Sequence, residues 1–287
     1  MHPGALAAAH PDKPAYVMAG SGRAVTFREL DEASNRLAQE LFDRGLRPGD
    51  SIAICMENNA DYVPALWAAH RSGLYYTAAS SRLTAAELAY IVEDCAAKAF
   101  ITSCDKRDLA SAVLPDIGQV ETRLMVGGTI DGYEPYEHVV AAASAEPLAE
   151  ELEGRDMLYS SGTTGRPKGV RVALPGKPLG NPTSVAVLGM GLYGFDADMV
   201  YLSPAPLYHA APLRFTMAVT QAGGTVVVME HFDPVEYLEL VERFHVTHTQ
   251  VVPTMFVRLL KLPEDERRGH DVSSIRYCIH AAAPCPV

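Results

Sequence analysis

The stretch YSSGTTGRPKG, residues 159–169, places three glycines and four hydroxyl side chains around a single lysine. The glycines allow the backbone to turn tightly and to bring N–H groups close to an anion. Lys168 adds one compact positive charge. The hydroxyl groups that act as further donors belong to Ser160, Ser161, Thr163 and Thr164. The stretch therefore predicts a cradle for a polyphosphate.

Two other interpretations compete for this stretch. A polar surface loop would also be rich in serine, threonine and glycine. The phosphate loop of kinases and ATPases requires two glycines five residues apart, followed by lysine and then serine or threonine. Here Pro167 stands five residues after Gly162, and Gly169 follows Lys168. The sequence therefore departs from the kinase-type pattern at two positions.

On both sides of the loop, short apolar runs alternate with segments whose apolar residues recur at helical spacing. The predicted strands cover 51–56, 99–102, 225–229, 247–252 and 275–279. The predicted helices cover 26–41, 61–71 and 84–94, and two more begin at 234 and 253. Capping residues mark three of these starts, namely Thr26, Thr84 and Asp233. This alternation predicts an α/β fold with parallel sheets covered by helices.

The alternation is lost between residues 129 and 155, where the sequence becomes acidic and rich in alanine. This segment is the best internal boundary. We expect a first α/β subdomain over residues 1–150 and a second over residues 151–287, which begins with the phosphate loop.

Composition narrows the possible partners and compartments. The chain has 287 residues and a formal net charge of −11, which argues against a nucleic-acid-binding surface. Its five cysteines are scattered and form no metal-ligand spacing, which favours a reducing compartment. No secretory signal is recognisable, and no apolar run approaches the ~18 residues that cross a bilayer. We expect a cytoplasmic protein without a transmembrane segment; peripheral contact with lipid and the oligomeric state stay open.

A second glycine pattern, GMGLYG at residues 189–194, matches the dinucleotide fingerprint GxGxxG. That fingerprint needs a preceding strand, here 184–188, a helix that opens at the glycines and an acidic residue ~20 positions later. Arg214 and Thr216 occupy that distance instead. NAD or FAD binding is therefore kept only as an alternative.

The stretch 159–169 resembles the phosphate loop of the adenylate-forming (AMP-binding) enzymes, which include acyl- and aryl-CoA synthetases, luciferases and peptide-synthetase adenylation domains. Its leading Tyr159-Ser160-Ser161 is most similar to fatty-acyl-CoA synthetases, the long-chain-fatty-acid–CoA ligases. Residues 25–30, 70–73 and 81–84 resemble earlier segments of that family in the same order. The resemblance implies the αβαβα parallel-sheet subdomains of the acyl-CoA synthetase-like N-terminal domain, truncated before the C-terminal domain.

The resemblance also assigns nucleotide-binding residues. It implies that the loop holds the β- and γ-phosphates of ATP, with Thr164 next to Mg²⁺ and Lys168 among the catalytic residues. The implied nucleotide contacts are Ser160, Ser161, Gly162, Thr163, Thr164, Gly165, Arg166, Pro167, Lys168, Ala282, Ala283 and Pro284. The last three resemble a segment that lies along the adenine, although Ala281 stands where relatives carry glycine.

A second set of residues resembles the wall of the acid pocket in this family. Its members are Tyr208, His209, Ala210, Ala211, Val252 and Pro253. His209 is expected to position the substrate rather than to act as a general base. The two small alanines would leave room for a bulky apolar acid.

The implied function is ATP-dependent activation of a carboxylic acid, most like a fatty acid, as acyl-AMP, followed by transfer to coenzyme A. An aryl-acid ligase, an enzyme that loads a carrier protein and a non-catalytic nucleotide-binding remnant remain alternatives. Several motifs of the family, including a magnesium-binding glutamate and the adenylation lysine, do not occur before Val287. We therefore expect this chain alone to be inactive or nearly so. The exact acid stays open.

Overall fold

The computed structural model describes residues 1–160 and 167–280. The chain divides into two compact units: unit 1 comprises Met1–Arg28 and Pro182–Val287, and unit 2 comprises Glu29–Asn181. The expected boundary at residue 150 does not coincide with this division. Strand β8 (Arg155–Asp156) pairs with β4 of unit 2, so the chain stays with the first sheet beyond residue 150. Strand β1 (Pro14–Met18) pairs with β12, so the N-terminus joins the later residues.

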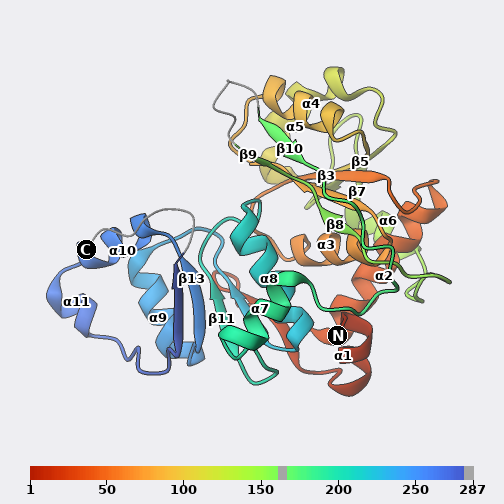
Figure 1. Ribbon diagram of the computed structural model, residues 1–287. Coiled ribbons are helices and arrows are strands. Elements are labelled where there is room, and N and C mark those ends of the chain that lie inside the picture. Colours follow the sequence, from red (N-terminus) through yellow and green to blue (C-terminus); the bar gives the residue numbers. More distant parts are fainter. Residues whose placement is uncertain (161–166, 281–287) are drawn as a thin grey trace. The chain divides into compact units, whose positions relative to one another are not determined.

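Unit 2 contains a six-stranded sheet in the order β7-β6-β5-β3-β4-β8, with every pair parallel. Its other strands are β3 (Ser51–Cys55), β4 (Tyr75–Ala78), β5 (Ala97–Ser103), β6 (Thr122–Val126) and β7 (Glu134–Pro135). The helices around it are α2 (Phe27–Asp43), α3 (Tyr62–Arg71), α4 (Ala85–Asp94), α5 (Arg107–Val113) and α6 (Tyr136–Ala142), with short 3₁₀ turns at Cys104–Lys106 and Leu114–Ile117. Figure 1 shows α4 and α5 on one side of β3 and β5, and α3 on the other.

Helix α4 is held in place by both its start and its buried face. The Thr84 hydroxyl accepts a hydrogen bond from the Glu87 N–H at 3.3 Å, and the Glu87 carboxylate accepts one from the Thr84 N–H at 2.9 Å. This reciprocal pair is the predicted capping box. Leu88, Ile91 and Val92 are buried against the sheet. The position of α4 is therefore fixed relative to the sheet, and so are the positions of the residues on its exposed face.

Unit 1 contains the second sheet, in the order β14-β13-β11-β12-β1-β2, in which only β2 runs antiparallel to its neighbour. Its other strands are β2 (Ala24–Thr26), β11 (Val200–Ser203), β12 (Thr225–Val228), β13 (His248–Val251) and β14 (Tyr277–His280). The helices of this unit are α1 (Pro3–Ala9), α7 (Ser184–Leu192), α8 (Ala210–Ala222), α9 (Pro234–Phe244), α10 (Pro253–Leu260) and α11 (Glu264–Arg268). The predicted α/β fold with parallel sheets is confirmed.

The dinucleotide-binding alternative is wrong. Residues 184–188 belong to helix α7 rather than to a strand, so the glycines do not follow a strand. A Cβ atom on Gly189 would lie 2.4 Å from the Phe195 ring. Gly189 therefore serves close packing within unit 1.

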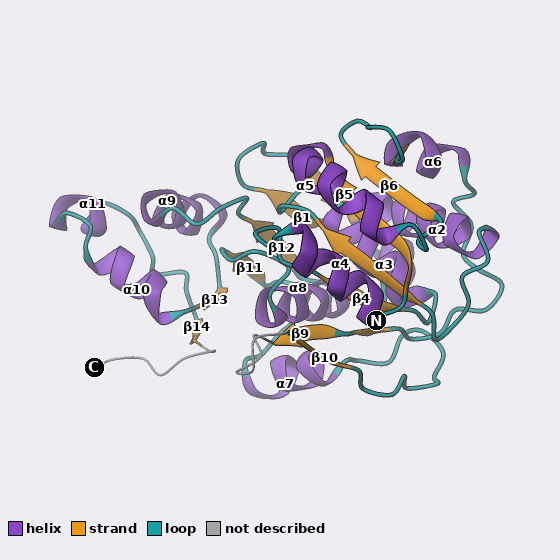
Figure 2. Cartoon of the chain, turned by 90° about the horizontal axis from the view of Figure 1, so that it is seen from above, coloured by secondary structure: helices purple, strands orange, loops and turns teal. Residues whose placement is uncertain are grey.

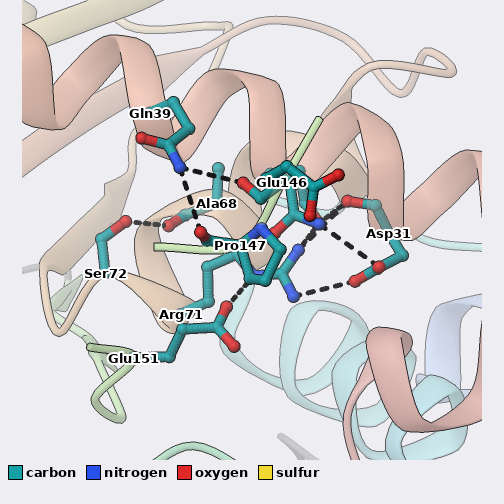
Figure 3. Close-up of polar contacts among 10 residues, drawn as sticks. Asp31, Gln39, Ala68, Arg71, Ser72, Glu146, Pro147 and Glu151 are labelled. Carbon is teal, nitrogen blue, oxygen red and sulfur yellow. Dashed lines mark hydrogen bonds and ion pairs between the residues drawn. The ribbon is translucent and has the colours of Figure 1, made fainter. Parts of the chain in front are cut away.

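A buried arginine joins three separate segments of unit 2 (Figure 3). Arg71, at the end of α3, has a side chain that is 1% exposed. Its guanidinium donates to the Asp31 carboxylate at 2.8 Å and the Ser34 hydroxyl at 2.8 Å, both on α2. It also donates to the Glu151 carboxylate at 2.6 Å, just before β8. A buried charge with this many partners fixes α2, α3 and the chain entering β8 to one another.

We predict that Arg71→Ala lowers the free energy of unfolding by about 3 kcal/mol, because two carboxylates lose their shared cation in a largely buried place. The matched control is Arg28→Ala on the same helix as Asp31. Arg28 pairs with Asp12 at 3.0 Å, with side chains 53% and 88% exposed. We expect its removal to cost less than about 1 kcal/mol. Urea unfolding of both variants measures the difference, and equal losses would contradict the structural role given to Arg71.

Candidate functional site

The phosphate loop connects the two strands of a separate hairpin. Strands β9 (Leu158–Ser160) and β10 (Lys168–Val170) lie side by side (Figure 2) and pair antiparallel. In this pairing Ser160 lies opposite Lys168. Both of these residues are exposed. The structure therefore brings together the hydroxyl before the loop and the lysine after it. The predicted contacts that lie outside the described residues are Ser161, Gly162, Thr163, Thr164, Gly165 and Arg166.

The third glycine of the stretch has a packing role in this hairpin. Gly169 lies opposite Tyr159 in the strand pairing. A Cβ atom at this position would lie 2.6 Å from the Met157 methyl carbon and 2.8 Å from Cζ of Tyr159. Glycine therefore leaves the space that the Tyr159 ring occupies, and a larger residue would displace the ring.

The hairpin is also tied to helix α4. The Tyr159 hydroxyl donates a hydrogen bond to the Asp94 carboxylate at 2.5 Å. Burial, and after it this hydrogen bond, raise the pKa of the Tyr159 hydroxyl above its ordinary value, so it stays protonated and able to donate. The Tyr90 hydroxyl donates to the Pro167 carbonyl at 3.3 Å. Sequence reasoning missed Tyr90 and Asp94; their spacing of four residues on a helix was the available signal.

The predicted acid-pocket residues follow the carboxyl ends of neighbouring parallel strands in unit 1. Tyr208 and His209 come after β11, and Val252 and Pro253 come directly after β13. Strand β13 pairs in parallel with both β11 and β14. These residues therefore lie at the edge of the sheet that is formed by the carboxyl ends of its strands. Open α/β sheets bind their ligands at this edge.

Local structure explains how this edge presents its side chains. His209 is the N-cap of α8, and its backbone N–H donates to the Pro206 carbonyl at 3.1 Å. Its ring centroid lies 4.4 Å from that of Tyr208. His209 and Ala210 are exposed, while Tyr208, Ala211, Val252 and Pro253 are half-buried. The edge therefore combines two aromatic rings with small side chains, as expected for a surface that accepts an apolar molecule.

The remaining predicted adenine contacts, Ala282, Ala283 and Pro284, lie outside the described residues. They follow directly after β14, which ends at His280. Among residues 1–160 and 167–280, no helix is long and apolar enough to cross a membrane.

Comparison with known proteins gives consistent matches along nearly the whole chain. The family described as AMP-binding enzyme matches residues 5–287. The chain is 30% identical to 4-coumarate–CoA ligase 3 of Arabidopsis thaliana over 282 residues, covering 95% of this chain and 49% of that protein. It is 31% identical to a feruloyl-CoA synthase of Amycolatopsis over 271 residues, covering 92% of this chain and 50% of that protein. The chain therefore spans about half the length of the curated relatives it matches.

The fold is also similar to solved structures. The N-terminal domain of FACL13 from Mycobacterium tuberculosis superposes with a TM-score of 0.85 at 23% identity, covering 99% of this chain and 69% of that one. At this level of identity the match establishes the architecture alone.

Proposed function

Because this chain belongs to the AMP-binding enzyme family, we propose that it carries the phosphate-binding part and one wall of the acid pocket of an acid–CoA ligase. The observation that carries the proposal is the hairpin in which Ser160 and Lys168 face each other across the two ends of a donor-rich loop. A cation beside hydroxyl and backbone donors suits an anion of high charge. The substrates of the proposed reaction are a carboxylic acid, ATP and coenzyme A.

The proposed reaction has two displacement steps. A carboxylate oxygen of the acid attacks the α-phosphorus of ATP, and pyrophosphate leaves, which gives acyl-AMP. The sulfur of coenzyme A then attacks the acyl carbon, its proton is lost, and AMP leaves with the electron pair of the broken bond. Transfer of this kind depends on positioning and on neutralising charge rather than on covalent help from the protein. Lys168 fits this need because its ammonium group is exposed beside the loop.

Magnesium belongs to this proposal as the partner of ATP. Among the described residues, no group of three or more His, Cys, Asp or Glu side chains could hold a metal ion. Mg²⁺ that accompanies a nucleotide is usually held by substrate phosphates and water, with one or two protein ligands. The Thr164 hydroxyl is the proposed protein contact, and the bound ion would neutralise part of the phosphate charge.

A fatty acid is the proposed acyl substrate. Ala210 and Ala211 begin helix α8 at the edge of the sheet, and methyl side chains there leave space that larger residues would fill. The residues proposed to line this wall, Tyr208, His209, Val252 and Pro253, include no carboxylate, lysine or arginine side chain. A long apolar chain would gain most from such a wall, at ~25 cal/mol for each Å² of apolar surface removed from water.

An aryl acid is the second candidate. The relatives at 30–31% identity are named for hydroxycinnamate-type acids, 4-coumarate and ferulate. The Tyr208 and His209 rings, 4.4 Å apart, offer faces and edges against which an aromatic acid could stack. Loading of a carrier protein and a purely nucleotide-binding role stay as further alternatives.

We predict that Lys168→Ala weakens binding of Mg·ATP by about tenfold or more, because a charge-assisted contact to phosphate is lost. Calorimetric titration of the 287-residue chain measures the dissociation constant. The control is Lys98→Ala, an equal change of charge at a half-exposed lysine of unit 2 that pairs with Asp50 at 2.8 Å. We expect this control to bind Mg·ATP like the parent chain. Unchanged affinity in Lys168→Ala would remove the main support for the proposal.

Stable analogues of the acyl-adenylate distinguish the two acids. We predict that dodecanoyl-sulfamoyl-adenosine binds about tenfold more tightly than its 4-coumaroyl counterpart, because it buries more apolar surface. We also expect Ala211→Leu to weaken the dodecanoyl analogue while leaving Mg·ATP unaffected. Tighter binding of the coumaroyl analogue would favour the aryl-acid ligase instead, and equal binding of both would leave the alanines without a role in selection.

A further inference from the structure

One face of helix α4 contacts both ends of the phosphate loop. Tyr90 and Asp94 are four residues apart on this helix and therefore project from the same side. Asp94 accepts a hydrogen bond from Tyr159, which precedes the loop, and Tyr90 donates one to Pro167, which follows it. All of these residues belong to unit 2. The helix thus bridges the two strands of the hairpin at the point where the loop leaves them.

The contact at the first end is the shorter one. The Tyr159 hydroxyl lies 2.5 Å from the Asp94 carboxylate, within the range of a charge-assisted O–H···O bond. The same ring packs where Gly169 leaves space on the opposite strand. The Tyr159 hydroxyl is therefore held by α4, and its ring packs against β10. Both constraints act on the backbone that continues directly into Ser160.

The contact at the second end acts on the backbone immediately before Lys168. Pro167 has a fixed φ angle, so holding its carbonyl also restricts the orientation of the peptide that enters Lys168. The Tyr90 hydroxyl holds this carbonyl at 3.3 Å. Lys168 then pairs with Ser160 in the hairpin. Helix α4 therefore partly sets the direction in which the Lys168 side chain projects from β10.

The surface beside this contact does not itself suit an anion. An open pocket next to Tyr90 and Pro167 carries three carboxylates, those of Glu87, Glu93 and Asp116. Negative side chains would repel a polyphosphate. Helix α4 can therefore support phosphate binding through the backbone that it holds, and not through direct contact with the nucleotide.

We infer that Tyr90, Asp94 and Tyr159 are positioning residues that hold both ends of the phosphate loop against helix α4, and so place Ser160 and Lys168 for a triphosphate. This inference rests on the proposed function. The helix suits the task because its start is capped by Thr84 and its inner face is buried against the sheet, which fixes the positions of Tyr90 and Asp94. The binding energy that would otherwise be spent on ordering the hairpin is then available for the ligand.

The test compares binding of Mg·ATP with binding of AMP by calorimetry in the 287-residue chain. Tyr159→Phe and Asp94→Ala each remove the first contact, and we expect each to weaken Mg·ATP by about fivefold, the effect of one lost hydrogen bond. The double variant should be no weaker than either single one, because both changes remove the same bond. Asp94→Asn keeps an acceptor and should restore most of the affinity. Tyr90→Phe should show a smaller loss of the same kind.

AMP binding separates positioning from general damage to the fold. We expect the affinity for AMP, which lacks the β- and γ-phosphates, to change by less than about twofold in all of these variants. The matched control is Tyr133→Phe, which removes a buried hydroxyl that donates to the Ala110 carbonyl at 2.9 Å and not to a residue of the hairpin. It should lower thermal stability and leave Mg·ATP binding unchanged.

The possible outcomes separate this inference from the function on which it rests. Unchanged Mg·ATP affinity in Tyr159→Phe and Asp94→Ala, or equal losses for ATP and AMP, would overturn the positioning role alone. If the parent chain bound neither nucleotide, the proposed function would fail, and the positioning role would fail with it.

Discussion

A triphosphate can be held tightly only if its donors are in place before it arrives, because every group that must be ordered on binding reduces the affinity. In the site proposed for this chain, that constraint falls on one antiparallel strand pair. Ser160 faces Lys168 across the hairpin, and the absence of a side chain at Gly169 leaves room for the Tyr159 ring from the opposite strand. The hydroxyl of Tyr159 then reaches Asp94 on a capped and buried helix. Each of these features has a local cause, and together they fix where the loop begins and ends.

The second half of the proposed site depends on a different regularity, the parallel sheet of unit 1. Parallel strands leave all their carboxyl ends at one edge, so segments far apart in the sequence arrive side by side without any special pairing between them. Tyr208 and His209 follow β11, and Val252 follows β13, the strand that pairs in parallel with β11. We propose that the aromatic and small side chains that follow these strands form one wall of an apolar acid pocket.

Local sequence patterns predicted the elements well because their causes are local. The capping box at Thr84 and the N-cap at Asp233, whose carboxylate accepts from the Val235 and Glu236 N–H groups, were readable from spacing alone. The boundary between the two units could not be predicted from spacing, because the pairing of β1 with β12 and of β8 with β4 joins residues that are distant in the sequence. The support of the phosphate hairpin by α4 was missed for the same reason. The phosphate-binding chemistry of the glycine-rich stretch stays a prediction, and the fold adds the contacts that its two ends make with α4.

The measurement that tests this account most directly is amide hydrogen exchange across the hairpin, followed by mass spectrometry with and without Mg·ATP. Peptides that cover residues 158–170 should exchange more slowly when nucleotide is bound, while the buried strand β3 of the same unit should be unchanged. Protection should be lost when Lys168 is replaced by alanine. If Mg·ATP bound to the chain and these peptides exchanged at the same rate as in its absence, the phosphate hairpin would not be the nucleotide site.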